Sequence, residues 1–263
     1  MKSLSLPERQ SILGIEISSG TQADAIDTIM GWCRDGRKEF VVTPNLDHVL
    51  KLETSEPFRA AYRNAQLVLA DGWPLVAMGK VLGRPVSRIT GSDLINPLCA
   101  AAAAQGHSVF LFGTTFDALR ESARTLAGRY PALNIAGIYS PPRGFDQDNA
   151  EADTIVELIN SVEPAIILVA LGAPRQEIWA DTMRDRLACN ALVCIGGGLD
   201  FISGKVPRAP KLWQKFGIEW LWRAVSEPRR LGLRYLNIIL RLPMIMLRQA
   251  FSRKQGQLTS RRG

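Results

Sequence analysis

Short apolar runs alternate with amphipathic stretches along most of this 263-residue chain. Runs rich in Val, Ile and Leu predict buried strands, and apolar residues at helical spacing predict helices between them. The predicted strands are Ile12–Ile17, Phe40–Thr43, Leu67–Ala70, Val109–Phe112, Asn134–Tyr139, Ala165–Ala170 and Leu192–Ile195. The predicted helices are Gln22–Cys33, Ser92–Ala104, Phe116–Arg129, Ala150–Ser161 and Pro174–Arg186. This alternation predicts an α/β fold with a Rossmann-like, mostly parallel sheet covered by helices on both faces.

The pattern changes near Val206–Pro210, after which long helical stretches replace the alternation. We therefore predict a catalytic body over residues 1–209 and a helical appendage over residues 210–263. The charge divides at the same place. Residues 211–263 hold twelve Lys or Arg and two Glu, whereas residues 1–210 hold twenty basic and twenty-three acidic residues. A near-neutral body with a basic, apolar tail favours an anionic membrane surface as the partner, and not nucleic acid.

The appendage contains a basic stripe on an apolar background. Leu231–Phe251 is long enough to span a bilayer, but it carries three arginines, which makes spanning costly. On an ideal helix Arg230, Arg234, Arg241 and Arg248 fall within roughly 40° of one another. This pattern predicts a helix lying at the membrane interface. The alternative is a helix packed on the body or in a dimer, and the sequence leaves homo-oligomerisation open.

Other features limit the chemistry and the compartment. The four cysteines form no CxxC pair, which disfavours a zinc site or a disulfide framework and favours reduced cytosolic thiols. The N-terminal MKSLSLPERQ has no apolar core, so no signal peptide is expected. Neither histidine sits in a triad pattern and GxSxG is absent, so hydrolase chemistry has little support.

Polar residues follow several predicted strands, where a parallel sheet places its ligands. Thr43 and Asn45 come after one strand, and their hydroxyl and amide groups can bind a sugar or a phosphate. Asp71 follows another strand and is placed to act as a general base in a cleft. The alternatives are a turn and a helix cap at Thr43–Asn45 and a capping role for Asp71.

Glycine-containing strand ends are candidate seats for a diphosphate. Gly113 and Gly172 each follow a strand, and Gln176 in the next helical turn can bind a hydroxyl-rich ligand. The run Gly196–Asp200, which includes Gly197, allows backbone N–H groups to approach a diphosphate. Ordinary turns and an exposed helix residue are the alternatives. Neither GxxxxGK[ST] nor GxGxxG is present, which weakens a P-loop or a dehydrogenase interpretation.

Arginines near these segments are candidate anion ligands. Arg88 precedes a predicted helix N-terminus, and Arg208 follows the glycine run beside Lys205. Asp146–Asp148 spells DxD, a metal-binding pattern of many glycosyltransferases. Its place at the start of a predicted helix favours interaction with the helix dipole, so we predict no metal.

Taken together, these segments resemble the WecG/TagA/CpsF family, glycosyltransferase family 26. The resemblance covers nearly the whole chain and rests on the order and spacing of six motifs. They are TPN at 43–45, ADG at 70–72, RITGSDL at 88–94, LGAPRQE at 171–177, SGKVPRAP at 203–210 and GIEWLWRAVSEPRR at 217–230.

The resemblance implies an inverting transferase that needs neither a metal nor a cofactor, with an appendage that completes the site at the membrane. It assigns Asp71 as the base with Thr43 as its partner, and Asn45 and Gln176 as donor contacts. It assigns Arg223 and Arg230 to the lipid diphosphate. The family carries a further arginine near 233, where this chain has Leu233 beside Arg234.

The resemblance also implies the substrates: a UDP-sugar donor and a polyprenyl-diphosphate-linked sugar acceptor. The enzyme would be peripheral to the cytoplasmic face of the bacterial inner membrane. Trp73-Pro74 departs from the small or aliphatic residues usual after ADG. Together with the length, this suggests the xanthan or acetan type, which moves glucose onto glucosyl-diphosphate-polyprenol in exopolysaccharide assembly. The alternatives are transfer of N-acetylmannosamine or its uronic acid, and a non-catalytic nucleotide-binding subunit.

Overall fold

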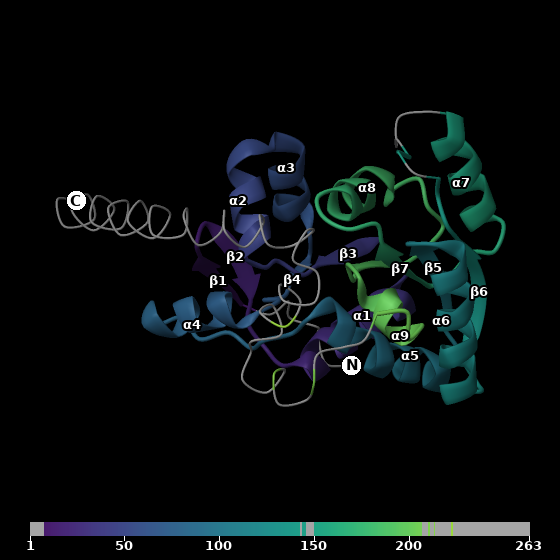
Figure 1. The fold of residues 1–263 in the computed structure, drawn as a ribbon, viewed down its shortest axis with the longest axis horizontal. Helices are drawn as coiled ribbons and strands as arrows, with labels where there is room; N and C mark the ends of the chain where they lie inside the picture. Colours follow the sequence, from purple (N-terminus) through teal and green to yellow (C-terminus); the bar gives the residue numbers. More distant parts are fainter. Residues whose placement is uncertain are drawn as a thin grey trace.

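A computed structural model describes residues 8–142, 144–145, 150–206, 210, 213 and 222 of the chain. A six-stranded sheet lies at its centre, and every adjacent pair of strands is parallel (Figure 1). In spatial order the strands are β4 (Leu67–Val68), β3 (Glu39–Val42), β8 (Ala191–Cys194), β7 (Ile166–Ala170), β5 (Ser108–Gly113) and β6 (Asn134–Tyr139). The prediction of an α/β fold with a mostly parallel sheet is confirmed.

Helices cover both faces of this sheet. One face packs against α2 (Leu46–Thr54), α3 (Glu56–Asn64), α4 (Trp73–Val81), α7 (Ala150–Asn160) and α8 (Arg175–Met183). The other packs against α1 (Gln22–Asp35), α5 (Gly91–Gln105), α6 (Phe116–Arg129) and α9 (Gly198–Ile202). Successive strand residues alternate between the two cores, as Phe110 and Phe112 do with Val109 and Leu111. Because both faces are buried, the central strands are continuous apolar runs in the sequence.

The N-terminal segment corrects one prediction. A single strand was predicted over Ile12–Ile17, but the chain forms an antiparallel hairpin of β1 (Arg9–Ile12) and β2 (Ile15–Ser18). Leu13 and Gly14 make its two-residue turn, with φ values of 50° and 77°. Such a turn suits the twist of a hairpin, although its residues do not form one of the usual glycine-asparagine pairs.

The hairpin covers the edge of the sheet at β4. The hydroxyl of Ser18 accepts a hydrogen bond of 3.1 Å from the backbone N–H of Val68. The guanidinium of Arg9 donates to the carbonyl groups of Ala65 and Gln66, at 2.6 and 3.0 Å. These bonds occupy backbone groups that an open edge would leave to another chain.

The remaining helices and strands agree with the predictions where they are long and differ where they are short. The predicted Asn134–Tyr139 strand and Phe116–Arg129 helix agree with β6 and α6. The helix predicted to reach Arg186 ends at Met183, and α2, α3, α4 and α9 were not predicted. Three of these four helices have nine residues and the fourth has five, so each holds little periodic signal.

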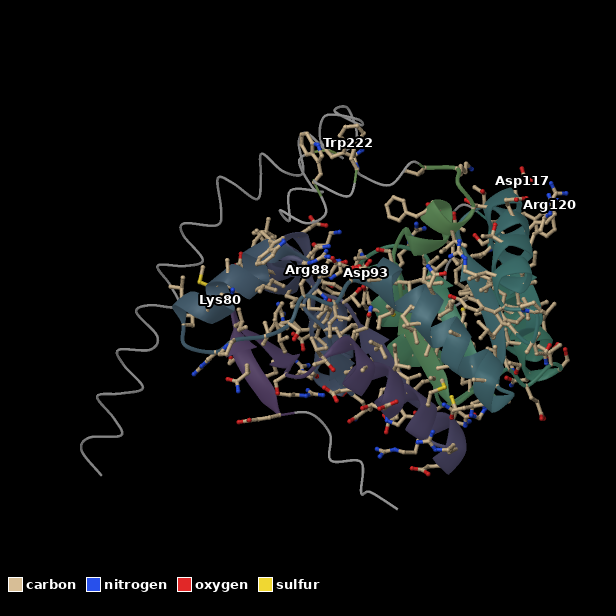
Figure 2. The ribbon with its side chains drawn as sticks, turned by 90° about the horizontal axis from the view of Figure 1, so that it is seen from below. Lys80, Arg88, Asp93, Asp117, Arg120 and Trp222 are labelled. Atoms are coloured by element: carbon tan, nitrogen blue, oxygen red, sulfur yellow. The ribbon has the colours of Figure 1, made fainter. Side chains whose placement is uncertain are left out.

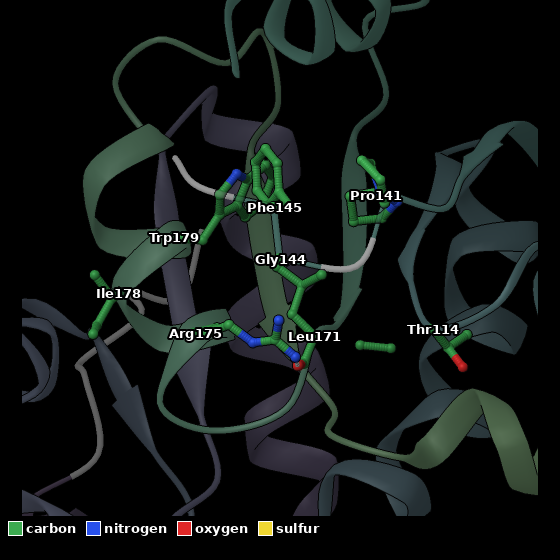
Figure 3. Close-up of a pocket in the computed structure, with 10 residues that line it drawn as sticks. Thr114, Pro141, Gly144, Phe145, Leu171, Arg175, Ile178 and Trp179 are labelled. Carbon is green, nitrogen blue, oxygen red and sulfur yellow. Dashed lines mark hydrogen bonds between the residues drawn. The ribbon is translucent and has the colours of Figure 1, made fainter. Parts of the chain in front are cut away.

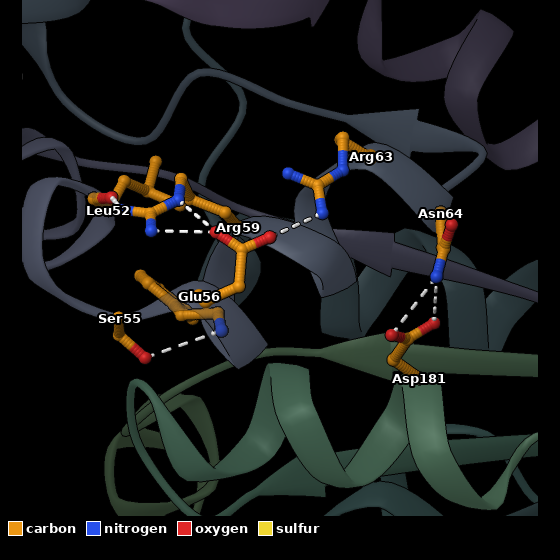
Figure 4. Close-up of polar contacts among 8 residues, drawn as sticks. Leu52, Ser55, Glu56, Arg59, Arg63, Asn64 and Asp181 are labelled. Atoms are coloured by element: carbon orange, nitrogen blue, oxygen red, sulfur yellow. Dashed lines mark hydrogen bonds and ion pairs between the residues drawn. The ribbon is translucent and has the colours of Figure 1, made fainter.

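Polar contacts join α3 to α8 (Figure 4). The Asn64 side-chain amide donates to both carboxylate oxygens of Asp181, at 3.0 and 3.2 Å. On α3 itself, Glu56 binds the guanidinium groups of Arg59 and Arg63, each at 2.7 Å. The Asn64–Asp181 contact joins α3 to the helix that follows β7, whereas the Glu56 pairs lie within α3.

Most of the predicted appendage, residues 210–263, lies outside the described residues. Within it the indole rings of Trp213 and Trp222 meet edge to face, with their centroids 5.5 Å apart. In the described part of the chain, no helix combines the length and the apolar character needed to cross a membrane. The division into body and appendage stays a prediction.

Gly113 provides a test of this packing. Its φ is 113°, and an added Cβ would lie 2.5 Å from the carbonyl carbon and oxygen of Ala170 on the neighbouring strand. We expect Gly113→Ala to lower the free energy of unfolding by about 2–4 kcal/mol. The control is Gly128→Ala in α6, where an added Cβ meets nothing within 4 Å. It should stabilise the protein by about 0.5–1 kcal/mol in urea unfolding. Equal effects of the two substitutions would contradict this packing argument.

Candidate active site

In two pairs of neighbouring strands, one strand is followed by a helix on one face of the sheet and the other strand by a helix on the opposite face. β7 continues into α8 on one face, whereas its neighbour β5 continues into α6 on the other. In the same way β3 leads to α2, whereas its neighbour β8 leads to α9. In open α/β sheets, a crevice for ligands forms outside the carboxyl ends of strands at such points. The residues that follow β3, β8, β7 and β5 therefore define the candidate site.

Asp71 lies at the edge of this region. Parallel pairing continues beyond β4, because Leu69 N–H donates to Val42 at 2.9 Å and Asp71 N–H donates to Pro44 at 2.7 Å. The backbone thus places Asp71 beside Thr43–Asn45, and its side chain is half-buried. The N-terminal segment of α5 joins the same edge, since Ile89 N–H donates to the carbonyl of Ala70 at 2.9 Å. The backbone therefore brings Asp71, Thr43–Asn45 and the segment that precedes α5 together at the ends of β3 and β4.

The two residues after β3 both make structural contacts. Thr43 is buried, and its hydroxyl donates to the carbonyl of Cys194 at 3.2 Å. Asn45 caps α2, because its side-chain oxygen accepts from the backbone N–H of Asp47 at 3.0 Å. The cap considered from the sequence is therefore present. Their predicted roles toward a donor stay predictions.

Gln176 is buried, whereas an exposed helix residue was the alternative considered from the sequence. Its side-chain oxygen accepts from the backbone N–H of Gly196 at 3.0 Å, and its amide nitrogen donates to Glu177 at 2.8 Å. The loop after β7 and the glycine loop after β8 are joined through this one side chain. Gly172 and Gly197 lie on the same two loops.

Glu177 is fully buried beneath these loops. Burial raises the pKa of its carboxyl group from 4.5 to about 7. The hydrogen bond from Gln176 and the positive charge of Lys51 lower this pKa, but their effect is smaller than that of burial. Burial also raises the pKa of Tyr62 well above its usual value, and the negative charge of Glu177 adds to this shift. The Tyr62 hydroxyl lies 2.7 Å from Nδ1 of His48. A cluster of buried polar groups thus supports the site from below.

A cavity of about 820 Å³ lies at the ends of β5, β6 and β7 (Figure 3). It is lined by Thr114, Pro141, Pro142, Gly144, Phe145, Ala170, Leu171, Arg175, Ile178 and Trp179. Trp179 stacks on Phe112 with ring centroids 4.3 Å apart, and Phe145 meets Phe112 edge to face. A cavity of this size with aromatic walls and one arginine suits a ligand that combines a flat ring with an anionic group.

The far side of this cavity is tied to the glycine loop. The Thr114 hydroxyl donates to the carboxylate of Asp200 at 2.6 Å, and the Ser140 hydroxyl donates to the carbonyl of Thr114 at 2.7 Å. Asp200 and Gly113, both predicted donor-site residues, therefore lie at this end of the site. Asp200 already holds a hydroxyl in place.

Arg88 lies beside a second cavity of about 500 Å³. Its guanidinium is 3.5 Å from the carboxylate of Asp93, and the two side chains are close together in Figure 2. This cavity is lined by Thr21, Gln22, Ser87, Arg88, Ile89, Asp93 and Pro97. The other predicted ligands of the acceptor diphosphate, Arg208, Arg223, Arg230 and Arg234, lie outside the described residues.

Among the residues that the structure describes, no three His, Cys, Asp or Glu side chains are grouped to hold a metal ion. The Asp146–Asp148 segment lies outside that part of the chain. The prediction of metal-independent chemistry therefore stays a prediction.

Sequence reasoning missed the polar cluster and the cavity lining. No role was predicted for Glu177, the last residue of the LGAPRQE motif, and no contact was predicted between Tyr62 and His48. The LGAPRQE segment held a signal of the buried cluster. Its two polar residues Gln176 and Glu177 come directly before Ile178 and Trp179, in a helix that is buried on several sides. Trp179 and Phe145 each pack on Phe112 of β5, a residue distant from both in the sequence, so the sequence holds no local sign that they line one cavity.

Comparison with known proteins gives consistent matches. The sequence model of the Glycosyl transferase WecG/TagA/CpsF family matches residues 10–256. A protein of Staphylococcus aureus (strain MW2), named N-acetylglucosaminyldiphosphoundecaprenol N-acetyl-beta-D-mannosaminyltransferase, is 28% identical over 224 residues, which cover 84% of this chain and 86% of that protein. A protein of the same name from Bacillus spizizenii (strain ATCC 23059 / NRRL B-14472 / W23) is 31% identical over 192 residues, 73% of this chain and 72% of that protein.

The raised pKa of Glu177 predicts a pH-dependent stability. A carboxyl whose pKa is higher in the folded state contributes stability that is complete below about pH 4.5 and is lost as the pH rises through about 7. Glu177→Gln removes this titration while the shape is kept. From pH 5 to pH 8, the wild type should therefore lose about 2–3 kcal/mol of unfolding free energy relative to this variant.

Urea unfolding of both proteins at several pH values measures the difference, in which other titrating groups cancel. Lys51, Tyr62 and Cys194 are the groups whose charge interactions with Glu177 enter the measurement. Two stability curves that stay parallel from pH 5 to pH 8 would contradict the prediction.

Proposed function

The chain belongs to the WecG/TagA/CpsF family of glycosyltransferases, and on this premise we propose that it moves a sugar from a UDP-sugar to a polyprenyl-diphosphate-linked sugar. The observation that carries the proposal is a row of groups along one edge of the sheet. Asp71, Thr43, Gly196, Gly172 and the large cavity follow the ends of successive strands β4, β3, β8, β7 and β5.

This row matches the parts of a nucleotide sugar in their covalent order. Parallel strands lie about 4.8 Å apart, so the end of β4 is about 14 Å from the end of β7. In the proposed pose the nucleoside occupies the cavity against Trp179 and Phe145. The diphosphate crosses the loops at Gly172 and Gly196, and the sugar lies near Asp71.

Asp71 then acts as the general base. Its carboxylate takes the proton from the acceptor hydroxyl, whose oxygen attacks the anomeric carbon as the bond to the diphosphate oxygen breaks. Attack in line with the leaving group inverts the anomeric centre. Backbone N–H groups of the glycine loops and nearby cationic side chains stabilise the departing UDP, so no metal is required in this proposal.

The names of the two relatives support N-acetylmannosamine as the transferred sugar. This was the alternative left open by the sequence, and the relatives favour it over the glucose of the xanthan type. The acceptor in the proposal is accordingly N-acetylglucosaminyl-diphosphate-polyprenol. Arg223, Arg230, Arg234 and Arg208 are proposed to bind its diphosphate at the inner face of the cytoplasmic membrane, with Arg88 as a further candidate.

The role of Asp71 can be tested with a neutral variant. We expect Asp71→Asn to lower kcat by about 10²–10⁴, because the base is lost, while the Kd for UDP changes less than about threefold. The matched control is Asp117→Asn on α6, whose side chain is 83% exposed and pairs only with Arg120 among the interactions described here (Figure 2). Asp71→Asn with activity close to that of the control would refute the assignment.

The substrates can be tested with a panel. UDP-N-acetylmannosamine, UDP-glucose and UDP-N-acetylglucosamine are each incubated with synthetic lipid-linked N-acetylglucosamine or glucose, with and without EDTA. Mass spectrometry should detect transfer of N-acetylmannosamine to the N-acetylglucosaminyl lipid, unchanged by EDTA. Transfer of glucose alone would restore the xanthan-type interpretation. UDP binding without turnover on any acceptor would indicate a non-catalytic subunit.

A further inference from the structure

Glu177 is the only carboxyl group that is fully buried in the described part of the chain, and it lies in the first turn of α8. Its Oε1 atom accepts a hydrogen bond from Gln176, whereas its Oε2 atom is buried and has no hydrogen-bond partner among the described residues. A buried carboxyl with an unpaired oxygen is costly for stability. Packing alone therefore gives no reason for this residue type at this position.

The hydrogen bonds of Gln176 suggest a reason. The backbone N–H of Gly196 can only donate, so the side-chain atom that faces it at 3.0 Å must be the amide oxygen of Gln176. The NH₂ group of the same amide then faces Glu177 at 2.8 Å and needs an acceptor there. The carboxyl group supplies that acceptor and fixes which way the amide is turned.

The orientation of this amide determines the hydrogen bond to the glycine loop. If the amide turned by half a revolution, its NH₂ group would face the Gly196 N–H, and two donors would oppose each other. Gly196 has a φ of 56°, so the loop starts in a left-handed backbone conformation. The Gln176 oxygen accepts a hydrogen bond from the backbone N–H of this residue and so holds it in place.

We propose that Glu177 is a positioning residue that presets the Gly196–Gly198 loop for the donor diphosphate by holding the Gln176 amide in one orientation. This inference rests on the proposed function for the identity of the ligand. Glu177 touches neither substrate nor reacting atoms. It acts through Gln176, and Gln176 acts through Gly196.

Three variants test this chain of contacts from Glu177 through Gln176 to Gly196, which we call the relay. Glu177→Met keeps the approximate length but has no strong acceptor, whereas Glu177→Gln keeps an acceptor oxygen. Glu157→Met on the exposed side of α7 is the control for the same chemical change at the surface. Circular dichroism and thermal unfolding establish that each variant is folded.

Two measurements distinguish a role in positioning the Gly196–Gly198 loop from a general loss of protein stability. Backbone amide exchange of the segment 195–199 should be at least tenfold faster in Glu177→Met, and close to wild type in the other two. The Kd for UDP and the KM for the donor should rise about tenfold in Glu177→Met, with kcat reduced less than threefold. Glu177→Gln should recover most of the lost affinity. Unchanged exchange and unchanged UDP affinity in a folded Glu177→Met protein would overturn the proposal.

A second variant keeps the test valid if Glu177→Met fails to fold. Gln176→Met removes the middle of this chain of hydrogen bonds, and Gln176→Met/Glu177→Met removes both partners of its first hydrogen bond. If the two residues act as one unit, the double variant should match Gln176→Met in amide exchange of the segment 195–199 and in UDP affinity. A further tenfold loss of UDP affinity in the double variant, beyond that of Gln176→Met, would contradict the proposal.

The exchange measurement also separates this inference from the proposed function. It reports on the loop in the free protein, so it remains decisive if the wild type shows no transfer to a lipid acceptor. Fast exchange in Glu177→Met together with an inactive wild type would contradict the proposed function but support the positioning role of Glu177. Unchanged exchange in Glu177→Met together with an active wild type would contradict the positioning role but support the proposed function.

Discussion

The divergence of neighbouring parallel strands to opposite faces of the sheet is the constraint on which the site depends. Because β7 leads to α8 and β5 leads to α6 on the other face, the strand ends between them stay uncovered and leave the cavity beside Thr114 and Arg175. The same divergence at β3 and β8 separates the loop after β3 from the glycine loop after β8, and the half-buried Asp71 lies beside the first of these loops. Strand order alone therefore arranges the cavity, the glycines and the carboxylate in one row.

The sequence was sufficient for the parts of this arrangement that depend on local pattern. Continuous apolar runs identified the central strands, because a sheet buried on both faces leaves no polar alternation to misread. The same reasoning failed at Ile12–Ile17, where an apolar run continues through a two-residue turn at Leu13 and Gly14. A turn without its usual residues gives no signal that the run has reversed.

The candidate site was predictable only as a set of strand ends. The rule that ligands bind at carboxyl ends selected Thr43, Asp71, Gly172 and Gly196 before their strand order was known. The order itself comes from non-local pairing, which no spacing along the chain encodes. For this reason the sequence could not connect Glu177 with Tyr62, or Thr114 with Asp200, although the second pair lies 2.6 Å apart.

The position of Asp71 explains how one site can serve two very different substrates in the proposed function. β4 is the edge strand of the sheet, and the cavity at β5 and β7 lies on the far side of β3 and β8. A nucleotide seated in that cavity would reach Asp71 only with its sugar. α4 begins at Trp73, two residues after Asp71, and its last residue Val81 is 80% exposed. In the proposal a lipid-linked acceptor approaches the base from the α4 side without crossing the donor, which in-line attack on the anomeric carbon requires.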